Sequence, residues 1–365
     1  MRFGVEEEFF VVDPADGNVV PRADAVVVEA KKPLGTRADG EDTELQVESR
    51  TRPCTTAAEV TDQLREGRSW LAFAAAREDL AVIAAGTPVL GAAIPSPLVA
   101  GPRAELGRAV ARGLLDEYAI CAVHVHLEMP DREHAVLMSN HLRPYLPVLL
   151  ALTANSPYWS ERDTGYASWR TLLWSRWPVA GPPPYLRSAA HYDGLVEALC
   201  EAEAITSERG VYWDIRPSAQ HPTLEIRVGD IPITYEESAS YAALVRALAV
   251  SLLPAVERGD PGPALEPELM RLAYWRAARD GSSGSGIDVR TGKAVPAGEL
   301  VRRLVDAARP GLEQHGELGL VTRWLRRLDE KGDGAQRQRR IAAERGSLRD
   351  VVHHLIEQTG KGTFL

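Results

Sequence analysis

Three consecutive glutamates, Glu6 to Glu8, interrupt an apolar segment at residues 3–13. The β-branched and aromatic side chains around them predict a strand, which ends at the turn signal of residues 13–18. On a strand, Glu6 and Glu8 point to one face and Glu7 points to the other. Two carboxylates on one half-buried face repel each other and lose hydration, which favours either a cation between them or a solvated edge strand. Ligands of this kind suit Mg²⁺ or Mn²⁺ better than zinc.

The rest of the chain alternates between strand and helix signals. A capping box at 56–59, followed by apolar residues at helical spacing, predicts a helix that packs on a sheet. Strands in the first two thirds, with helices between and after them, indicate an α+β fold in a single domain. We expect further strands near 44–50, 80–85, 121–128, 211–216 and 223–229, a helix at 103–118, a helix capped by Asp131, a proline-rich loop at 177–185 that crosses the surface or a site, and mostly helix from 235 onward.

Composition narrows the possible partners and location. A formal net charge of −9 disfavours nonspecific binding to nucleic acid or to an anionic membrane. No apolar run reaches the roughly 18 residues of a membrane span, and the N-terminus lacks the pattern of a signal peptide. The three cysteines are too few and too scattered for a disulfide framework. We therefore expect a cytoplasmic protein with no nucleic-acid or membrane partner, and a homodimer as the default assembly.

Two further groups could bind metal. Glu41 and Glu48 form a second acidic pair, although acidic residues near turns are usually just solvated. His124 and His126 share one face of their predicted strand, a spacing that can hold a transition metal. No third nitrogen or sulfur ligand follows at a recognisable spacing, so ordinary hydrogen-bonded histidines are the alternative.

Residues 223–230 predict a strand with apolar residues on one face and Glu225 and Arg227 together on the other. A carboxylate for a metal beside a guanidinium for phosphate is the pair that phosphoryl transfer requires. A cross-strand salt bridge is the alternative interpretation. Asp214 and Arg216 repeat this pattern on the strand before. The chain contains neither a Walker loop nor the glycine-rich fingerprint of dinucleotide-binding folds.

Eight ordered motifs lie between about residues 3 and 280, and together they resemble the carboxylate-amine ligase family, also called glutamate–cysteine ligase type 2, a branch of the glutamine synthetase-like ligases. The motifs are GVEEEF at 4–9, ELQVESRT at 44–51, HVHLEMPD at 124–131, RPYLPVLLALTANSPYW at 143–159, DTGYASWR at 163–170, RWPVAGPPP at 176–184, VYWDIRPSAQHPTLEIRVGD at 211–230 and WRAARDG at 275–281.

The resemblance implies a glutamine synthetase-like fold, in which a curved, mainly antiparallel sheet holds ATP and divalent cations on its concave face and helices cover its outer face. It implies one catalytic domain over 1–365, with a ligase core to about 280 and a mostly helical part at about 281–365. It also implies transfer of the ATP γ-phosphoryl group to a carboxylate, such as that of glutamate, and attack by an amine, such as cysteine, on the acyl phosphate. By motif position, the implied metal ligands are Glu6, Glu8, Glu41, Glu48, His124 and Glu225; the implied catalytic residues are Arg227, Glu225 and Arg216; and the implied substrate or nucleotide contacts are Arg227, Arg276, Asn155, Arg170 and Asp214.

Two other functions remain open at this level. One is a zinc-dependent hydrolase that uses the His-x-His pair, and the other is a nucleotide-binding protein of the same fold without turnover. The chain also departs from the family pattern: Gly86-Thr87-Pro88 lacks the usual histidine, and Ala273-Tyr274 replaces the usual asparagine before Trp275. These departures leave the amine substrate open. The glycine- and serine-rich segment 281–286 is a lid or a linker.

Overall fold

The protein is described by a computed structural model that covers residues 1–91 and 94–362. Within these residues the main sheet has seven strands, ordered β10-β11-β5-β1-β3-β2 with β4 paired to the end of β1. All neighbouring pairs in this sheet are antiparallel. The strands are β1 (Phe3–Val12), β2 (Ala38–Gly40), β3 (Gln46–Arg50), β4 (Ala81–Ile83), β5 (Ala122–Glu128), β10 (Ile215–Pro217) and β11 (Thr223–Asp230). Short pairs outside it are β6 (Tyr158–Trp159) with β7 (Arg162–Asp163), β8 (Ala180–Gly181) with β9 (Tyr212–Trp213), and β12 (Ser285–Ile287) with β13 (Ala294–Pro296).

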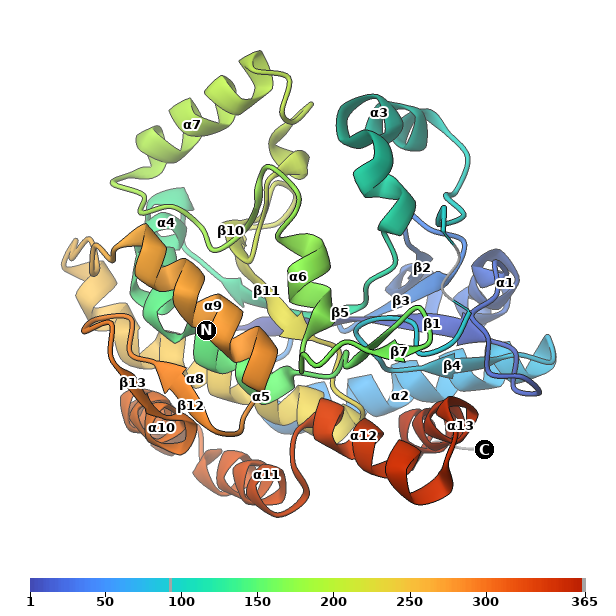
Figure 1. Cartoon of the computed structure of the whole chain (residues 1–365). Coiled ribbons are helices and arrows are strands. Elements are labelled where there is room, and N and C mark those ends of the chain that lie inside the picture. Colours follow the sequence, from blue (N-terminus) through green and yellow to red (C-terminus); the bar gives the residue numbers. More distant parts are fainter. Residues whose placement is uncertain (92–93, 363–365) are drawn as a thin grey trace.

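Helices surround the sheet (Figure 1). In this view α3 and α7 project together on one side, and α10 to α13 lie on the opposite side of the molecule. The helices are α1 (Ala23–Leu34), α2 (Ala57–Arg77), α3 (Pro102–Ala111), α4 (Arg132–Leu142), α5 (Leu146–Thr153), α6 (Trp169–Trp174), α7 (Ala189–Glu201), α8 (Tyr235–Glu257), α9 (Pro267–Asp280), α10 (Ala297–Gln314), α11 (Leu318–Lys331), α12 (Gly334–Arg345) and α13 (Leu348–Thr359).

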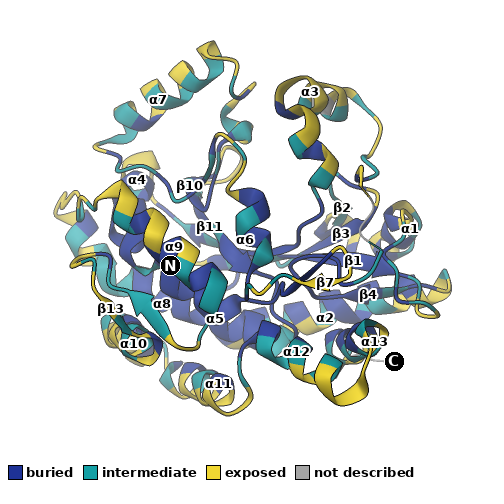
Figure 2. Cartoon of the chain, in the orientation of Figure 1, coloured by how far each residue is buried: buried dark blue, intermediate teal, exposed yellow. Residues whose placement is uncertain are grey.

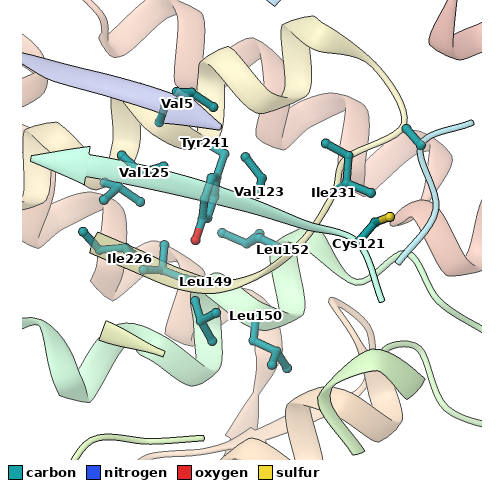
Figure 3. Close-up of a cluster of buried hydrophobic side chains, with 14 of the residues drawn as sticks. Val5, Cys121, Val123, Val125, Leu149, Leu150, Leu152, Ile226, Ile231 and Tyr241 are labelled. Atoms are coloured by element: carbon teal, nitrogen blue, oxygen red, sulfur yellow. The ribbon is translucent and has the colours of Figure 1, made fainter. Parts of the chain in front are cut away.

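The hydrophobic core lies on one face of the sheet. Figure 3 shows Val125 of β5 and Ile226 of β11 close to Leu149 of α5 and Tyr241 of α8. Figure 2 shows the middle of α8, residues 237–249, buried between the sheet and the outer helices. This helix is long and apolar enough to span a membrane, but most of its apolar window is buried inside the molecule, as expected of a core helix. The main core extends from Phe3 to Leu355, so the C-terminal helices pack on the same core as the sheet.

Local signals place most elements as the sequence predicts. The Thr56 side chain accepts a hydrogen bond from the Glu59 amide at the start of α2, and Asp131 caps α4 in the same way. The predicted helix over 103–118 is partly wrong. Helix α3 ends at Ala111 because Arg112 adopts a positive φ of 49°, and a 3₁₀ segment, Arg112–Glu117, follows.

The glycine- and serine-rich segment is ordered against the C-terminal helices. The amide and hydroxyl of Ser282 both donate to the Asp333 carboxylate at the start of α12. The end of the segment pairs with residues 294–296 as β12 and β13. These contacts hold the segment beside α12.

Candidate active site

Antiparallel register brings the predicted acidic residues together on the face of the sheet opposite the core. Glu8 of β1 lies directly across from Glu48 of β3. Glu6 lies across from His124 of β5, and His126 lies across from Glu225 of β11. Strands that are distant in sequence therefore place their polar side chains in neighbouring rows.

These rows form the floor of a cavity of about 590 Å³. Helix α3 and its 3₁₀ extension contribute to one wall, and residues 204–210 after α7 contribute to another. The segment Trp177–Val179 also lines it, which confirms that the proline-rich loop crosses a site. All six predicted metal ligands line this cavity: Glu6, Glu8, Glu41, Glu48, His124 and Glu225.

Glu8, Glu41 and Glu48 form the first acidic cluster. Burial raises the pKa of Glu8 to about 7, although the Ala122 amide donates a hydrogen bond of 2.7 Å to its Oε2. Burial and the charges of Glu8 and Glu48 raise the pKa of Glu41 well above its ordinary value. Burial and Glu6 also raise the pKa of Glu48, which shares a hydrogen bond with Glu41 and an ion pair with Arg50. The raised pKa values reflect burial and the mutual repulsion of these carboxylates, which a bound cation would offset.

Glu6 is the centre of a second cluster with two histidines. Its oxygens lie 3.3 Å from His124 Nδ1 and 3.3 Å from His126 Nε2, and His124 Nε2 lies 3.6 Å from Glu8 Oε1. Burial and the charge of Arg227 lower the pKa of His124 to about 3, so its imidazole is neutral near pH 7. Although burial opposes the shift, the two histidines lower the pKa of Glu6 well below its ordinary value. A neutral imidazole and an ionised carboxylate are both able to bind a metal.

Glu225 lies between two arginines. Arg216 Nε is 2.8 Å and Arg227 Nη1 is 3.3 Å from the same oxygen, Oε2. Burial alone would raise the pKa of Glu225, but the two guanidinium groups lower it to about 2. Arg227 keeps a buried Nε without a hydrogen-bond partner. The Arg227 residue lines the cavity, where a guanidinium group suits a phosphate.

The donor set fits a hard divalent cation, although no ion site is fully assembled. Within residues 1–91 and 94–362, no three His, Cys, Asp or Glu side chains already have the arrangement of a metal site. Glu48 and Glu225 are engaged instead with arginines, and Glu6 with histidines. The concentration of oxygen donors suits Mg²⁺ or Mn²⁺.

Glu7 has a separate role on the core side of the sheet. Arg68 of α2 donates two hydrogen bonds to its carboxylate, at 3.0 and 2.6 Å, and both side chains are buried. Arg68 also donates to the carbonyls of Pro232 and Ile233 just before α8. Arg68 thus connects β1 to α2 and to the start of α8, on the side of the sheet opposite the acidic cavity. The sequence predicts the face of Glu7, but its partner is 61 residues away and gives no local signal.

Two of the predicted substrate or nucleotide contacts lie away from the cavity lining and hold backbone in place. The side-chain amide of Asn155 donates hydrogen bonds to the backbone carbonyls of Ala84 and Ile231. Arg170 donates to the carbonyls of Arg227 and Val228 and is buried. Both residues thus hold backbone groups of the strands and loops beside the cavity, and the charge of Arg170 also lowers the pKa of Glu8 against the effect of burial.

Asp214 and Arg276 are also outside the cavity lining. Asp214 lies between β9 and β10, and its backbone carbonyl accepts a hydrogen bond of 2.7 Å from the Arg227 amide. Its carboxylate is buried, and burial raises its pKa to about 6. Arg276 pairs with Asp280 at 2.8 Å and donates to the Ser285 carbonyl.

Sequence reasoning missed an aromatic group on the cavity wall. Tyr118, Trp177 and Tyr212 all line it. The rings of Tyr118 and Trp177 meet edge to face with centroids 5.5 Å apart, and those of Trp177 and Tyr212 are 6.0 Å apart. The tryptophan next to prolines in a loop predicted to cross a site was the one available signal.

Comparison with known proteins adds an independent line of evidence. Residues 2–354 match the model of glutamate–cysteine ligase family 2. A protein of Mycobacterium sp. (strain KMS) that carries the provisional name glutamate–cysteine ligase 2-2 is 42% identical over 363 residues, which is 98% of each chain. A similarly named protein of Nocardia farcinica is 40% identical over 361 residues, covering 98% of this chain and 93% of the relative.

Solved structures show the same fold. A glutamate–cysteine ligase of Francisella tularensis, solved in complex with AMP, superposes with a TM-score of 0.71 at 12% identity over 99% of this chain and 89% of its own. A bifunctional glutathione synthetase of Pasteurella multocida gives 0.70 at 17% identity, with 98% of this chain matched to 52% of that one. The expected α+β, glutamine synthetase-like fold is therefore confirmed. By sequence and by fold, the chain belongs to glutamate–cysteine ligase family 2 and is an ATP-dependent carbon–nitrogen ligase.

Proposed function

We propose that this ligase activates a carboxylic acid, such as glutamate, as an acyl phosphate and joins it to an amine on the acidic face of the sheet. The observation that carries the proposal is the convergence of Glu6, Glu8, Glu48 and Glu225 from three strands in one cavity beside Arg216 and Arg227. A carboxylate is a poor acyl donor, and phosphorylation supplies a leaving group. The many carboxylates and arginines on one face match the charge of a triphosphate and its metal ions.

The site residues form two sets that would bind metal ions and one set that would contact the phosphoryl group. Glu8, Glu41 and Glu48 would hold one Mg²⁺ or Mn²⁺, and Glu6, His124 and Glu225 would hold another. Such ions, when bound, offset the negative charge of the phosphate oxygens during transfer. Arg216 and Arg227 both line the cavity and are held side by side by Glu225, so both would contact the transferring phosphoryl group.

The remaining side chains protect and orient the reactants. The cavity walls formed by α3 and by the Trp177 loop restrict water, which would otherwise hydrolyse an acyl phosphate. Because Asn155, Arg170, Asp214 and Arg276 engage backbone or interior groups, we assign them to support of the site. The His-x-His pair contacts Glu6, and the ring of His221 lies 6.4 Å from that of His126. No three His, Cys, Asp or Glu side chains of the described residues have the arrangement of a metal site, so zinc hydrolysis gains no specific support.

The direct test is release of ADP in the presence of candidate acids, with hydroxylamine as a small general nucleophile. Hydroxylamine displaces phosphate from an acyl phosphate, and the hydroxamate that forms is coloured with ferric ion. We expect ADP and hydroxamate in equal amounts with the correct acid, and at least about a hundredfold loss in Glu8→Gln. Nucleotide binding without ADP or hydroxamate, across a broad panel of acids, would instead indicate a protein of this fold without turnover.

A further inference from the structure

The cavity has one wall whose chemistry does not match a phosphate or a carboxylate. Leu106 and Val110 lie one helical turn apart on α3 and both line the cavity, yet they are 45% and 40% exposed. Single exposed apolar side chains are common on protein surfaces. Two such side chains that face into a cavity, with Leu114 following them, leave apolar area that a bound ligand would cover.

The aromatic group continues this apolar surface toward the floor of the cavity. Tyr118 follows α3 and its 3₁₀ extension, and its ring packs against Trp177. An ion pair of 2.9 Å between Arg176 and Glu117 joins the Trp177 loop to the α3 side. We call Leu106, Val110, Leu114, Tyr118, Trp177 and Tyr212 the apolar wall. Its lower part is fixed by ring contacts and one ion pair.

The apolar wall adjoins the first acidic cluster. Tyr118 lines the same cavity as Glu8 and Glu41, and burial together with the charges of Asp42, Glu41 and Glu8 raises its pKa. The polar residues Arg209, Ser218 and Gln220 line the cavity as well, beside the Arg216–Glu225 pair. A ligand on the apolar wall would thus have one end close to the proposed site of phosphoryl transfer.

We propose that the apolar wall is the subsite of the acceptor amine, and that this amine carries a bulky aliphatic or aromatic side chain. The inference rests on the proposed ligase function. The triphosphate of ATP and the acid are anions and need charged partners, whereas an amine must lose its proton before it attacks, and apolar surroundings favour that neutral form. Six large side chains form a surface greater than the single CH₂–SH group of cysteine would cover. The acceptor class therefore differs from the one that the family name suggests.

The test compares amines of increasing chain length, using the acid that supports hydroxamate formation. We expect kcat/KM to rise about fourfold per methylene from ethylamine through butylamine to hexylamine, and phenethylamine to exceed ethylamine by at least about tenfold. The variant Leu106→Ser/Val110→Ser should reduce the ratio of hexylamine to ethylamine by about tenfold or more. Both side chains are partly exposed, so this variant should fold. Leu272→Ser, on the surface of α9 and also 40% exposed, is the matched control and should leave the ratio unchanged.

Three other results would contradict the inference. If the double variant raises KM for ATP and leaves the ratio of amines unaltered, the apolar wall binds the nucleotide base and the inference is wrong. If hydroxamate forms with hydroxylamine but kcat/KM for the alkylamines does not depend on their chain length, the inference is wrong and the ligase proposal remains intact. Absence of hydroxamate with every acid would remove the proposed function and this inference with it.

Discussion

At the residue scale, adjacent glutamates on β1 face opposite environments. Glu7 points into the core and pairs with Arg68, whereas Glu8 points into the cavity and is surrounded by other carboxylates. A buried charge is tolerated when it is paired and hydrogen-bonded, and removing one partner leaves the other uncompensated. The same substitution at these two positions should therefore have different consequences.

Glu7→Gln should destabilise the fold by about 3–5 kcal/mol, because it leaves the Arg68 charge buried without its partner. Glu8→Gln should be neutral or stabilising without metal, since it removes a charge that the fold disfavours. Urea unfolding in EDTA measures both. Equal destabilisation by the two variants would contradict the separation of their roles.

The pKa of Glu8 also predicts how stability depends on pH. Burial raises this pKa to about 7, so between its ordinary value and pH 7 the folded chain holds a proton that the unfolded chain has lost. The contribution of Glu8 to stability without metal is then fully present at low pH and is lost as pH rises through that window, by about 3 kcal/mol. The lowered pKa of His124 has the opposite effect below pH 6.5, so the Glu8 contribution is measured as the difference between wild type and Glu8→Gln in urea unfolding at each pH. Glu225 titrates near pH 2 and contributes no change there.

Mg²⁺ should reverse this trend, because it binds the ionised carboxylates. We expect the rise in thermal midpoint caused by Mg²⁺ to be larger at pH 7.5 than at pH 5.5, and to be much reduced in Glu8→Gln. Sodium chloride at matched ionic strength is the control. A pH-independent effect of Mg²⁺ would argue against a metal site at Glu8.

At the element scale, the end of β11 is joined to its neighbours by one buried network. The Asp230 carboxylate accepts hydrogen bonds from the backbone amide of Asn155 and from the hydroxyls of Ser156 and Ser168. Asn155 in turn receives a hydrogen bond of 2.7 Å from Gln338 of α12. The pairing of β11 with β5 shifts register between Ile226 and Gly229, so this network fixes the strand just beyond the irregularity.

Asn155→Ala should destabilise the fold by about 2–3 kcal/mol, because two backbone carbonyls and Gln338 lose their partner. It should leave KM for ATP within about twofold of the wild-type value, since the side chain does not line the cavity. Chemical unfolding and steady-state kinetics test the two parts separately. A large rise in KM for ATP with unchanged stability would contradict this prediction and would indicate that Asn155 contacts the nucleotide, as the family resemblance implies.

At the scale of the whole molecule, hydrogen bonds and an ion pair connect the C-terminal helices to the ligase core. Thr359 at the end of α13 accepts a hydrogen bond from the Ala84 amide after β4. Arg246 of α8 pairs with Glu317 before α11, and Glu317 also accepts from the Ala57 amide at the start of α2. The sequence predicts one catalytic domain over 1–365, and these contacts favour joint unfolding of the ligase core and the helical part.

Leu355→Ala tests that prediction, because Leu355 is fully buried in α13. We expect a loss of about 2–5 kcal/mol, expressed as one shifted transition in both far-ultraviolet circular dichroism and tryptophan fluorescence. Two separate transitions, with the activity retained after the first, would show that α12 and α13 unfold independently of the ligase core.

The sequence by itself determined which side chains share a face. Alternation on β1 and β11 is set by the period of the extended chain, so Glu6 with Glu8, and Glu225 with Arg227, were predictable from spacing alone. Helix starts at Thr56 and Asp131 were equally local, because a cap depends on residues three positions apart.

Only the tertiary structure decided what each of these faces meets. Pairing of β1 with β3 and β5 put Glu48 and His124 beside Glu8 and Glu6, and long-range packing gave Glu7 its arginine and Asn155 its carbonyls. Family motifs mark positions without showing whether a side chain faces a cavity or the backbone behind it. The physical reason is that local periodicity fixes direction along an element, whereas distances between charges depend on strand register and on helices far away in the chain.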